Sequence, residues 1–294
     1  MGLDRSKKEK ILQKIVITLV ALATIFVFDF WLFSPREFFG SKPGQESADP
    51  NLPTNAEPTI GPDYQDFSPL SVKKTKREQN KANEQSTETL DIKPEVNLTV
   101  PFTVQAPFAK WDDLHNEACE EAALIMAKYW LSGRDLTLEA SEQEILAAVQ
   151  WQEQAFGGHY DLNVSDVVRL GNQYFGLGKI YFTSIENIND IKYQLSQGNL
   201  VLTPMAGRLL NNPYFRRPGP AYHMVVVKGY NSEEIITNDP GTKRGANFAY
   251  SNDIFFQAIY DWPYSPGEMT DLDQDAKAEE ILKGQRAMIV VEKE

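Results

Sequence analysis

The chain has 294 residues, of which 42% are hydrophobic, so it is long enough to bury a sizeable core. Its formal net charge of -12 argues against a nucleic-acid partner, because phosphate binding requires clustered Lys and Arg side chains. The single cysteine, Cys119, excludes an internal disulfide and must serve either packing or chemistry.

The first predicted element is an apolar stretch over residues 15–33, IVITLVALATIFVFDFWLF, in which Asp29 is the only charge. At about 1.5 Å per residue, a helix of this length nearly spans a hydrocarbon core of about 30 Å. Residues 1–14 form a basic segment, so the positive-inside rule predicts that they are cytoplasmic and that the rest is exported. We expect a transmembrane signal anchor in the cell membrane, with a cleaved signal peptide as the alternative.

Residues 34–97 are rich in Pro, Ser, Asn, Gln, Glu and Lys, and this composition cannot bury enough apolar surface to fold alone. We interpret them as a disordered linker. The globular pattern that follows contains neither an internal repeat nor a second linker. Residues 98–294 are therefore predicted to form one domain on the extracytoplasmic side.

That domain is predicted to begin with helices. The first has Asn116 as its N-cap and ends at Gly133, and its apolar residues cover most of its circumference, so it should be central and buried. Helices followed by strands indicate an α+β fold. Further helices are expected over residues 141–156, 164–176 and 185–197, and strands over residues 200–204, 224–230, 234–238 and 287–292.

Cys119 falls at the third residue of the first predicted helix. There, unpaired backbone N–H groups and the positive end of the helix dipole would stabilise a thiolate, the reactive form of cysteine. The alternative is that Cys119 is a small buried hydrophobe without a chemical role.

His223 opens the strand HMVVVKGY, and Asp239 ends the return strand of the same predicted hairpin. If Tyr230 pairs with one of the two glutamates after the turn, antiparallel registration makes His223 and Asp239 neighbours. A carboxylate beside an imidazole fixes its tautomer and stabilises its cation, as a catalytic base requires. The alternative is a surface hairpin with an incidental histidine. We rank His223 above His115, expected in a loop at the rim of the site, and His159, which lies among glycines between two helices.

The segment VPFTVQAPFAKWDDLHNEACEEAALIMAKYW, with HMVVVKGY and ITNDPGT later, resembles the bacterial papain-like cysteine peptidases related to the bacteriocin-processing, double-glycine-cleaving peptidases. The resemblance extends from about Val100 to the C-terminus. It implies a papain-like fold in which a central N-terminal helix carries the cysteine and packs on an antiparallel sheet.

The same resemblance implies an enzyme that hydrolyses peptide or protein substrates through a thioester. Following the family's pattern, Gln105 would supply an oxyanion-hole donor, Cys119 the nucleophile, His223 the base and Asp239 the residue that orients the base. A side-chain amide beside a backbone N–H is a suitable pair for a developing oxyanion.

Glu120 departs from that pattern, because many relatives carry glycine just after the nucleophile. A carboxylate beside a thiolate opposes its formation unless the carboxylate points away. Two other functions fit the same residues: an amidase or endopeptidase that cuts peptidoglycan stem peptides, and a binding module that has lost catalysis. The partners expected are a peptide or protein substrate and, through the N-terminal helix, a membrane.

No cofactor or metal is predicted. Asp271, Asp273 and Asp275 have the initial spacing of a calcium loop, but Ala276 and Leu282 stand where that loop requires Gly and Glu. We interpret these aspartates as the solvated start of a helix.

Overall fold

The computed structural model describes residues 91–293, which lie within one compact unit. The predicted basic segment, membrane anchor and most of the predicted linker lie outside the described residues. Within residues 91–293, none of the helices is both long and apolar enough to cross a membrane.

The described residues form a seven-stranded antiparallel sheet in the order β2-β7-β3-β4-β5-β6, and β1 pairs with β4. Strands β3, β4 and β7 are fully buried, as expected for runs rich in Val, Ile and Leu that are covered on both faces. The strands are β1 (Val96–Asn97), β2 (Ile180–Ser184), β3 (Leu200–Ala206), β4 (Tyr222–Tyr230), β5 (Glu234–Asn238), β6 (Phe248–Ser251) and β7 (Ala287–Val291).

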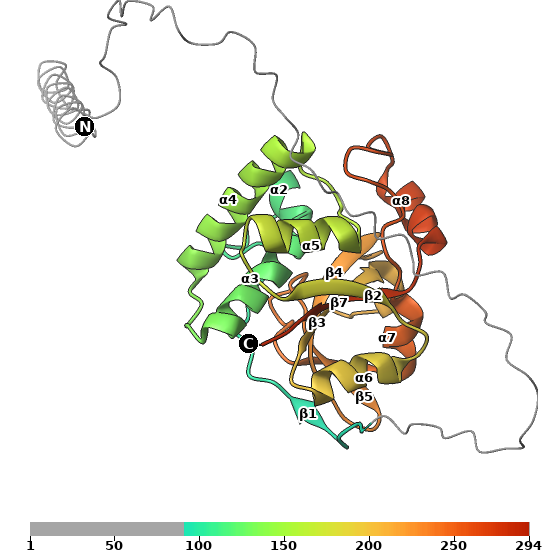
Figure 1. Cartoon of the computed structure of the whole chain (residues 1–294). Helices are drawn as coiled ribbons and strands as arrows, with labels where there is room; N and C mark the ends of the chain where they lie inside the picture. The colour runs from blue at the N-terminus through green and yellow to red at the C-terminus, as the bar shows by residue number, and fades with distance from the viewer. Residues whose placement is uncertain (1–90, 294) are drawn as a thin grey trace, which may run out of the picture. The chain divides into compact units, whose positions relative to one another are not determined.

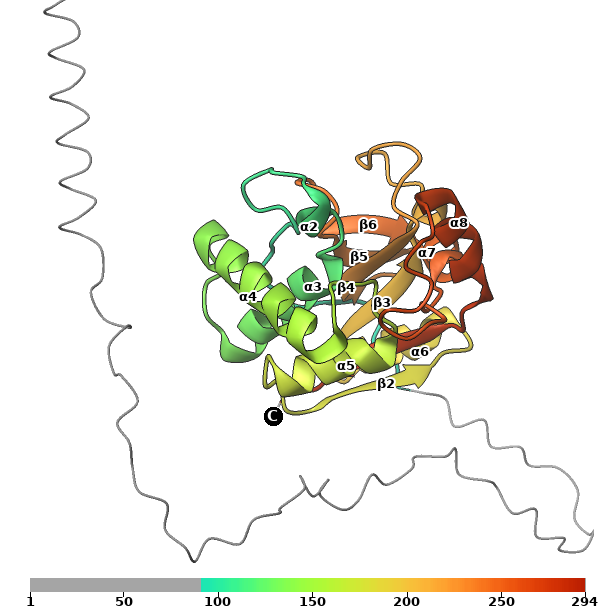
Figure 2. The same ribbon diagram turned by 90° about the horizontal axis from the view of Figure 1, so that it is seen from above.

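Helices cover both faces of this sheet (Figures 1 and 2). Buried residues of α3, α4 and α5 pack on one face, and those of α6 and α7 pack on the other. The helices are α2 (Asp113–Asn116), α3 (Cys119–Ser132), α4 (Leu138–Phe156), α5 (Val164–Gln173), α6 (Ile188–Ser196), α7 (Asn252–Ala258) and α8 (Gln274–Glu280), with short 3-10 helices η1 (Gly207–Leu210) and η2 (Ile281–Lys283).

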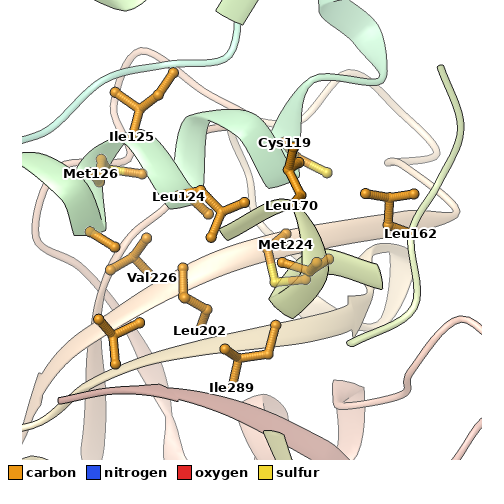
Figure 3. Packing of buried hydrophobic residues seen from close by; sticks show 14 of the residues in the cluster. Cys119, Leu124, Ile125, Met126, Leu162, Leu170, Leu202, Met224, Val226 and Ile289 are labelled. Carbon is orange, nitrogen blue, oxygen red and sulfur yellow. The ribbon is translucent and has the colours of Figure 1, made fainter. Parts of the chain in front are cut away.

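Strand β4 separates the two cores. Its residues Met224 and Val226 lie under α3, as Figure 3 shows, whereas Val225 and Val227 belong to the core on the α6 and α7 side. Side chains alternate along a strand, so His223 points away from the α3 face while the neighbouring Tyr222 points toward it. The start of β4 therefore presents one polar residue to each face of the sheet, Tyr222 to the α3 face and His223 to the other.

The fold confirms the α+β prediction, with a buried cysteine-bearing helix packed on an antiparallel sheet. The predicted N-cap was wrong, however. Asp112 accepts a hydrogen bond from the backbone N–H of His115 and so caps a separate short helix, α2, which ends at Asn116. The chain turns before Ala118, which caps α3 without a side-chain hydrogen bond. Cys119 is consequently the first residue of α3 and not the third.

The other predicted elements are present with shifted ends. Strand β5 has the predicted bounds, and Gly133 ends α3 in a left-handed conformation, with φ of 64°, that favours glycine. Helix α4 begins three residues before the predicted start because Thr137 caps it. Strands β1, β2 and β6 and helices α2 and α7 were not predicted. They are short elements, and β2 lies at the sheet edge with mostly exposed residues.

Candidate active site

The hairpin of β4 and β5 positions His223 beside Asp239. The turn is one residue longer than predicted, since Tyr230 pairs with Ile235, but a bulge between Val227 and Gly229 restores the register nearer the site. The ring Nε2 of His223 lies 2.8 Å from Oδ1 of Asp239, and both side chains are buried. The structure thus brings these two residues together as the hairpin register predicted.

Asp239 is held by several further donors. The hydroxyl of Tyr250 donates to its Oδ2 at 2.5 Å, the side-chain amide of Asn212 donates to the same oxygen at 3.1 Å, and the backbone N–H of Gly241 donates to Oδ1 at 2.9 Å. Burial by itself raises the pKa of Asp239, but the charge and hydrogen bond of His223 and the other donors outweigh it and hold the pKa below its usual value. The carboxylate therefore stays ionised and can stabilise an imidazolium.

Sequence patterns gave no signal for Tyr250 and Asn212 because they reach Asp239 from other elements, Tyr250 from β6 and Asn212 from the segment after η1.

Two neighbours fix the plane of the His223 ring. The edge of Phe215 meets that ring with centroids 5.4 Å apart. A Cβ atom added at Gly241 would lie 2.9 Å from Cε1 of His223, closer than carbon atoms approach without displacement. The absence of a side chain at Gly241 is therefore what allows the loop after β5 to close over the imidazole.

Cys119 lies at the start of α3 with 4% of its surface exposed. Its thiol donates a hydrogen bond to Oε2 of Glu120 at 3.0 Å, and Oε1 of Glu120 accepts from the backbone N–H of Leu162 at 2.9 Å. Burial raises the pKa of the Cys119 thiol well above its usual value, and the charge and hydrogen bond of Glu120 raise it further. Glu120 thus points toward the thiol, and the resting sulfur is a protonated thiol.

A network of carboxylates surrounds the start of α3. Glu121 is buried and contacts the side chains of Gln152 and His159, the latter at 3.1 Å. Burial lowers the pKa of His159, but the hydrogen bond and charge of Glu121 raise it more, so the net shift is upward. His159 therefore pairs with the carboxylate of Glu121. Among the described residues, no hydrogen bond joins His159 to His223 or Asp239.

Near the same helix start, Lys277 bridges two further acids. Its Nζ lies 2.6 Å from Asp161 and 3.5 Å from Glu117. Burial and the neighbouring charge of Asp161 raise the pKa of Glu117 despite the nearby ammonium. Glu117 therefore holds its proton to a higher pH than an exposed glutamate.

Gln105 ties the segment before α3 to the loop after Asp239. Its Nε2 donates to the backbone carbonyls of His115, at 2.8 Å, and Asn116, at 2.9 Å, while its backbone N–H donates to Pro240 O at 3.0 Å. Both hydrogens of the side-chain amide are thereby used, and Oε1 has no partner among the described residues. In this conformation Gln105 positions the main chain and has no amide hydrogen left for an oxyanion.

His115 is enclosed by acids. Its Nδ1 lies 2.6 Å from Asp112 and its Nε2 lies 3.2 Å from Glu142, and the side chain is buried. It was predicted to be a loop residue at the rim of the site, but it is part of α2 and packs inward. Because both ring nitrogens are engaged, His115 is not available as a base.

A cavity of about 920 Å³ adjoins the His223 pair. Its wall includes Gln105, Asn116, Glu117, His223 and Gly241, so it extends from the connection between α2 and α3 to the β4–β5 hairpin. Its volume lies within the range of small-molecule and peptide sites.

Cys119 does not contribute to that wall, and no hydrogen bond joins it to His223 in the described part of the chain. Figure 3 shows its side chain above Leu170 and Met224 in the hydrophobic core. Cys119, the predicted nucleophile, therefore follows the cavity-lining Glu117 by two residues, but its thiol packs in the hydrophobic core and not on the cavity wall.

Among residues 91–293, His, Cys, Asp and Glu side chains form no group that could hold a metal ion. Asp273 instead accepts hydrogen bonds from the backbone N–H groups of Asp275 and Ala276 and caps α8, so the predicted helix start is confirmed.

Comparison with known families and with solved structures finds similar proteins. Residues 97–265 match the model of the Peptidase_C39 like family, a span that includes Gln105, Cys119, His223 and Asp239. Among solved structures, the crystal structure of a protein described as a candidate C39-like peptidase from Bacillus anthracis matches with a TM-score of 0.42 and 14% sequence identity, covering 68% of this chain and 98% of that chain. None of the curated proteins matches the sequence.

Proposed function

The chain belongs to the Peptidase_C39 like family, and from this premise we propose that it is a cysteine peptidase that hydrolyses peptide bonds through a thioester on Cys119. One observation supports the proposal above the others: His223, which pairs with Asp239 at 2.8 Å, contributes to the wall of a cavity that extends to Glu117, two residues before Cys119. An oriented imidazole beside such a cavity is suited to acid and base catalysis.

The hydrogen bond to Asp239 determines which ring nitrogen would act. Because Nε2 of His223 donates to the carboxylate, Nδ1 is the nitrogen left to take a proton. In the proposed reaction, the thiol of Cys119 transfers its proton to Nδ1 while the sulfur attacks a peptide carbonyl. His223 then gives that proton to the leaving amine, and water hydrolyses the thioester through the same base.

The developing oxyanion needs donors. The first-turn backbone N–H groups of α3, including that of Cys119, have no acceptor within the helix and meet this need, since Ala118 supplies no side-chain cap. Gln105 could join them only by releasing the carbonyl of His115 or Asn116. We therefore assign Gln105 a positioning role in the resting state and an oxyanion role only after such a change.

Catalysis also requires the thiol to leave Glu120. A change in the Cys119 side-chain torsion is the smallest movement that redirects the sulfur toward the cavity, and binding of a substrate would have to supply its free energy. We propose that the resting enzyme is latent for this reason.

A non-catalytic peptide-binding module is the second candidate function. The observation that favours it is the burial of Cys119, whose thiol contacts a carboxylate and not a base. In that case the cavity would bind peptides without cleaving them.

We further propose that the domain acts outside the cytoplasm on a membrane anchor formed by residues 15–33. The support is the apolar composition of that stretch and the basic segment before it. Protease added to intact cells should degrade the domain if this orientation is right and leave it intact if the domain is cytoplasmic.

A proteome-derived peptide library tests the activity. Full-length wild type and the Cys119→Ser variant are incubated with the library, and new peptide ends are identified by mass spectrometry. The proposal predicts ends that the wild type produces and Cys119→Ser does not. Binding of peptides without new ends would support the binding module, and equal cleavage by both chains would contradict a role for Cys119. Muropeptides are incubated with the same chains in parallel, and cleavage of muropeptides alone would identify stem peptides as the substrate.

A further inference from the structure

The cavity beside His223 is basic, although the chain as a whole carries a net charge of -12. Five cationic side chains contribute to its wall, against the two carboxylates of Asp113 and Glu117. The five are Arg208, Arg216, Arg217, Lys243 and Arg244. A local excess of positive charge on an acidic protein is a candidate recognition surface, because it attracts anionic groups that the rest of the molecule repels.

Most of these cations are not neutralised by the protein. Arg208 is the exception, since its guanidinium pairs with Asp275 at 2.7 Å. Arg216, Arg217 and Lys243 are exposed, and within the described part of the chain their side chains form neither an ion pair nor a hydrogen bond. Surface cations without partners are available to a ligand.

Arg244, the remaining cation of the wall, is oriented by an aromatic ring. The guanidinium of Arg244 lies 4.8 Å from the ring centroid of Tyr214, which itself contributes to the cavity wall and is exposed. A guanidinium stacked in this way keeps its N–H edge for a carboxylate and loses less side-chain freedom on binding. This contact holds one cation against the wall of the cavity.

These cations lie on the two loops that also fix the catalytic pair. Phe215, which contacts the His223 ring, immediately precedes Arg216, and Gly241, which donates to Asp239, precedes Lys243 by two residues. Because each residue extends a chain by at most about 3.6 Å, the cations lie within a few residues' reach of His223. A peptide bound in this cavity would therefore pass close to them.

The segment around α2 adds groups of a different character to the wall. Trp111 and Asp113 contribute from there, and the Trp111 side chain is exposed. The cavity therefore offers an apolar surface and a carboxylate in addition to its uncompensated cations.

We propose that the substrate is an acidic peptide whose side-chain carboxylates are bound by Arg216, Arg217, Lys243 and Arg244 beside the cleaved bond. That the bound peptide is cleaved rests on the proposed peptidase function, whereas the preference for acidic peptides concerns binding alone. Arginine favours carboxylates because its planar fork can form two parallel hydrogen bonds with them.

Binding can be measured without catalysis. The full-length Cys119→Ser variant in detergent is titrated into three rhodamine-labelled peptides that share a glycine–alanine background and carry glutamates, glutamines or lysines at the same positions. Fluorescence anisotropy should give the tightest binding for the glutamate peptide, by about tenfold over the glutamine peptide, and the difference should shrink with added salt.

Charge reversal locates the site. Arg216→Glu with Lys243→Glu should weaken the glutamate peptide about tenfold and leave the glutamine peptide nearly unchanged. The control, Arg134→Glu with Lys179→Glu, makes the same change in net charge at exposed positions that do not contribute to the cavity wall. It should change neither affinity by more than about twofold.

Three results would overturn the inference: equal binding of the glutamate and glutamine peptides, equal losses in the two double variants, or displacement of the glutamate peptide by tripolyphosphate as readily as by unlabelled peptide. The last would indicate a general anion site. If the wild type cleaves library peptides without preference for acidic ones, the inference fails and the proposed function stands. If acidic peptides bind selectively but are never cleaved, the proposed function fails and the charge preference stands.

Discussion

Replacing Glu120 with glutamine should make Cys119 more reactive. The thiol donates to Oε2 of Glu120 at 3.0 Å, and the negative charge of that carboxylate opposes ionisation of the sulfur. At this distance and an effective dielectric constant of 20, the repulsion between two unit charges is roughly 5 kcal/mol. Glutamine has nearly the same shape, and its oxygen can still accept from the backbone N–H of Leu162, so the change removes mainly charge.

The free energy of thiolate formation in Glu120→Gln is not expected to fall by the full amount of this repulsion. The pKa of Glu120 is itself raised well above its usual value, first by burial and then by the charge of Glu121, so Glu120 is a weaker source of negative charge than an exposed glutamate. Burial, the largest cause of the raised thiol pKa, is unchanged by the substitution. We expect iodoacetamide to alkylate Cys119 in Glu120→Gln at least about tenfold faster than in wild type at pH 8, corresponding to about 1.4 kcal/mol.

Intact-mass spectrometry follows this reaction directly, because Cys119 is the single thiol of the chain. The rate is measured from pH 6 to pH 10 with circular dichroism at each pH to ensure that both chains remain folded. Glu139→Gln is the matched control, since Glu139 is an exposed residue in the first turn of α4. Equal alkylation rates for wild type and Glu120→Gln, or an equal increase in Glu139→Gln, would refute the view that Glu120 suppresses the thiolate.

Three other substitutions test the surroundings of the site. Gly241→Ala should push against the His223 ring and lower kcat by about tenfold or more with little change in KM, measured on any peptide that the wild type cleaves; unchanged kcat would mean that the loop yields. Asp239→Asn should lower kcat by about a hundredfold, because the imidazole loses its orienting charge. The folded-state pKa of Asp239 is depressed, so its ionised carboxylate stabilises the folded protein above the unfolded-state pKa, and this stabilisation is lost as pH falls through the folded-state pKa. The urea midpoints of Asp239→Asn and wild type should therefore converge in acid. A difference in midpoint that stays constant with pH would contradict this. The pH dependence of Asp261 has the opposite sign: burial raises its pKa to about 7, so wild type loses stability as pH rises from about 4 to 7. Asp261→Asn can still accept from the backbone N–H of Val164, and it should be more stable than wild type by about 4 kcal/mol at pH 8 and equally stable at pH 4. An equal gain at both pH values would refute the assignment.

The sequence was most informative about the hairpin. Val- and Ile-rich runs bounded by Asn, Gly and Pro predicted both strands, and antiparallel registration across the hairpin placed His223 and Asp239 together. The predicted register was off by one residue at the turn, and only the bulge before Gly229 made the outcome insensitive to that error. A bulge depends on how a strand meets both of its neighbours, so it leaves little trace in a single strand's composition.

The start of α3 was harder to predict because two capping residues compete there. Asn116 has the composition of an N-cap, but Asp112 caps an earlier turn and places Asn116 at its end. The direction of the Cys119 side chain was beyond local inference, because Glu120 is anchored by Leu162, 42 residues further along the chain. Contacts of this kind arise from the packing of separate elements and not from any periodicity in the sequence.

The charge of the cavity was likewise not evident from composition. The five cations of its wall come from η1 and two separate loops, and the acidic residues that give the chain its net charge outnumber them in the sequence. Only the fold gathers them beside His223.

The most direct test of the account is whether Cys119 reacts with a substrate-like electrophile in a manner that depends on His223. Full-length wild type, His223→Ala and Cys119→Ala are incubated with a peptide vinyl sulfone at pH 7.5, and adducts are quantified by intact mass. We predict an adduct on wild type, at least about a hundredfold slower labelling of His223→Ala and none on Cys119→Ala. Absence of an adduct on folded wild type, or equal rates for wild type and His223→Ala, would contradict a catalytic pair formed by these residues.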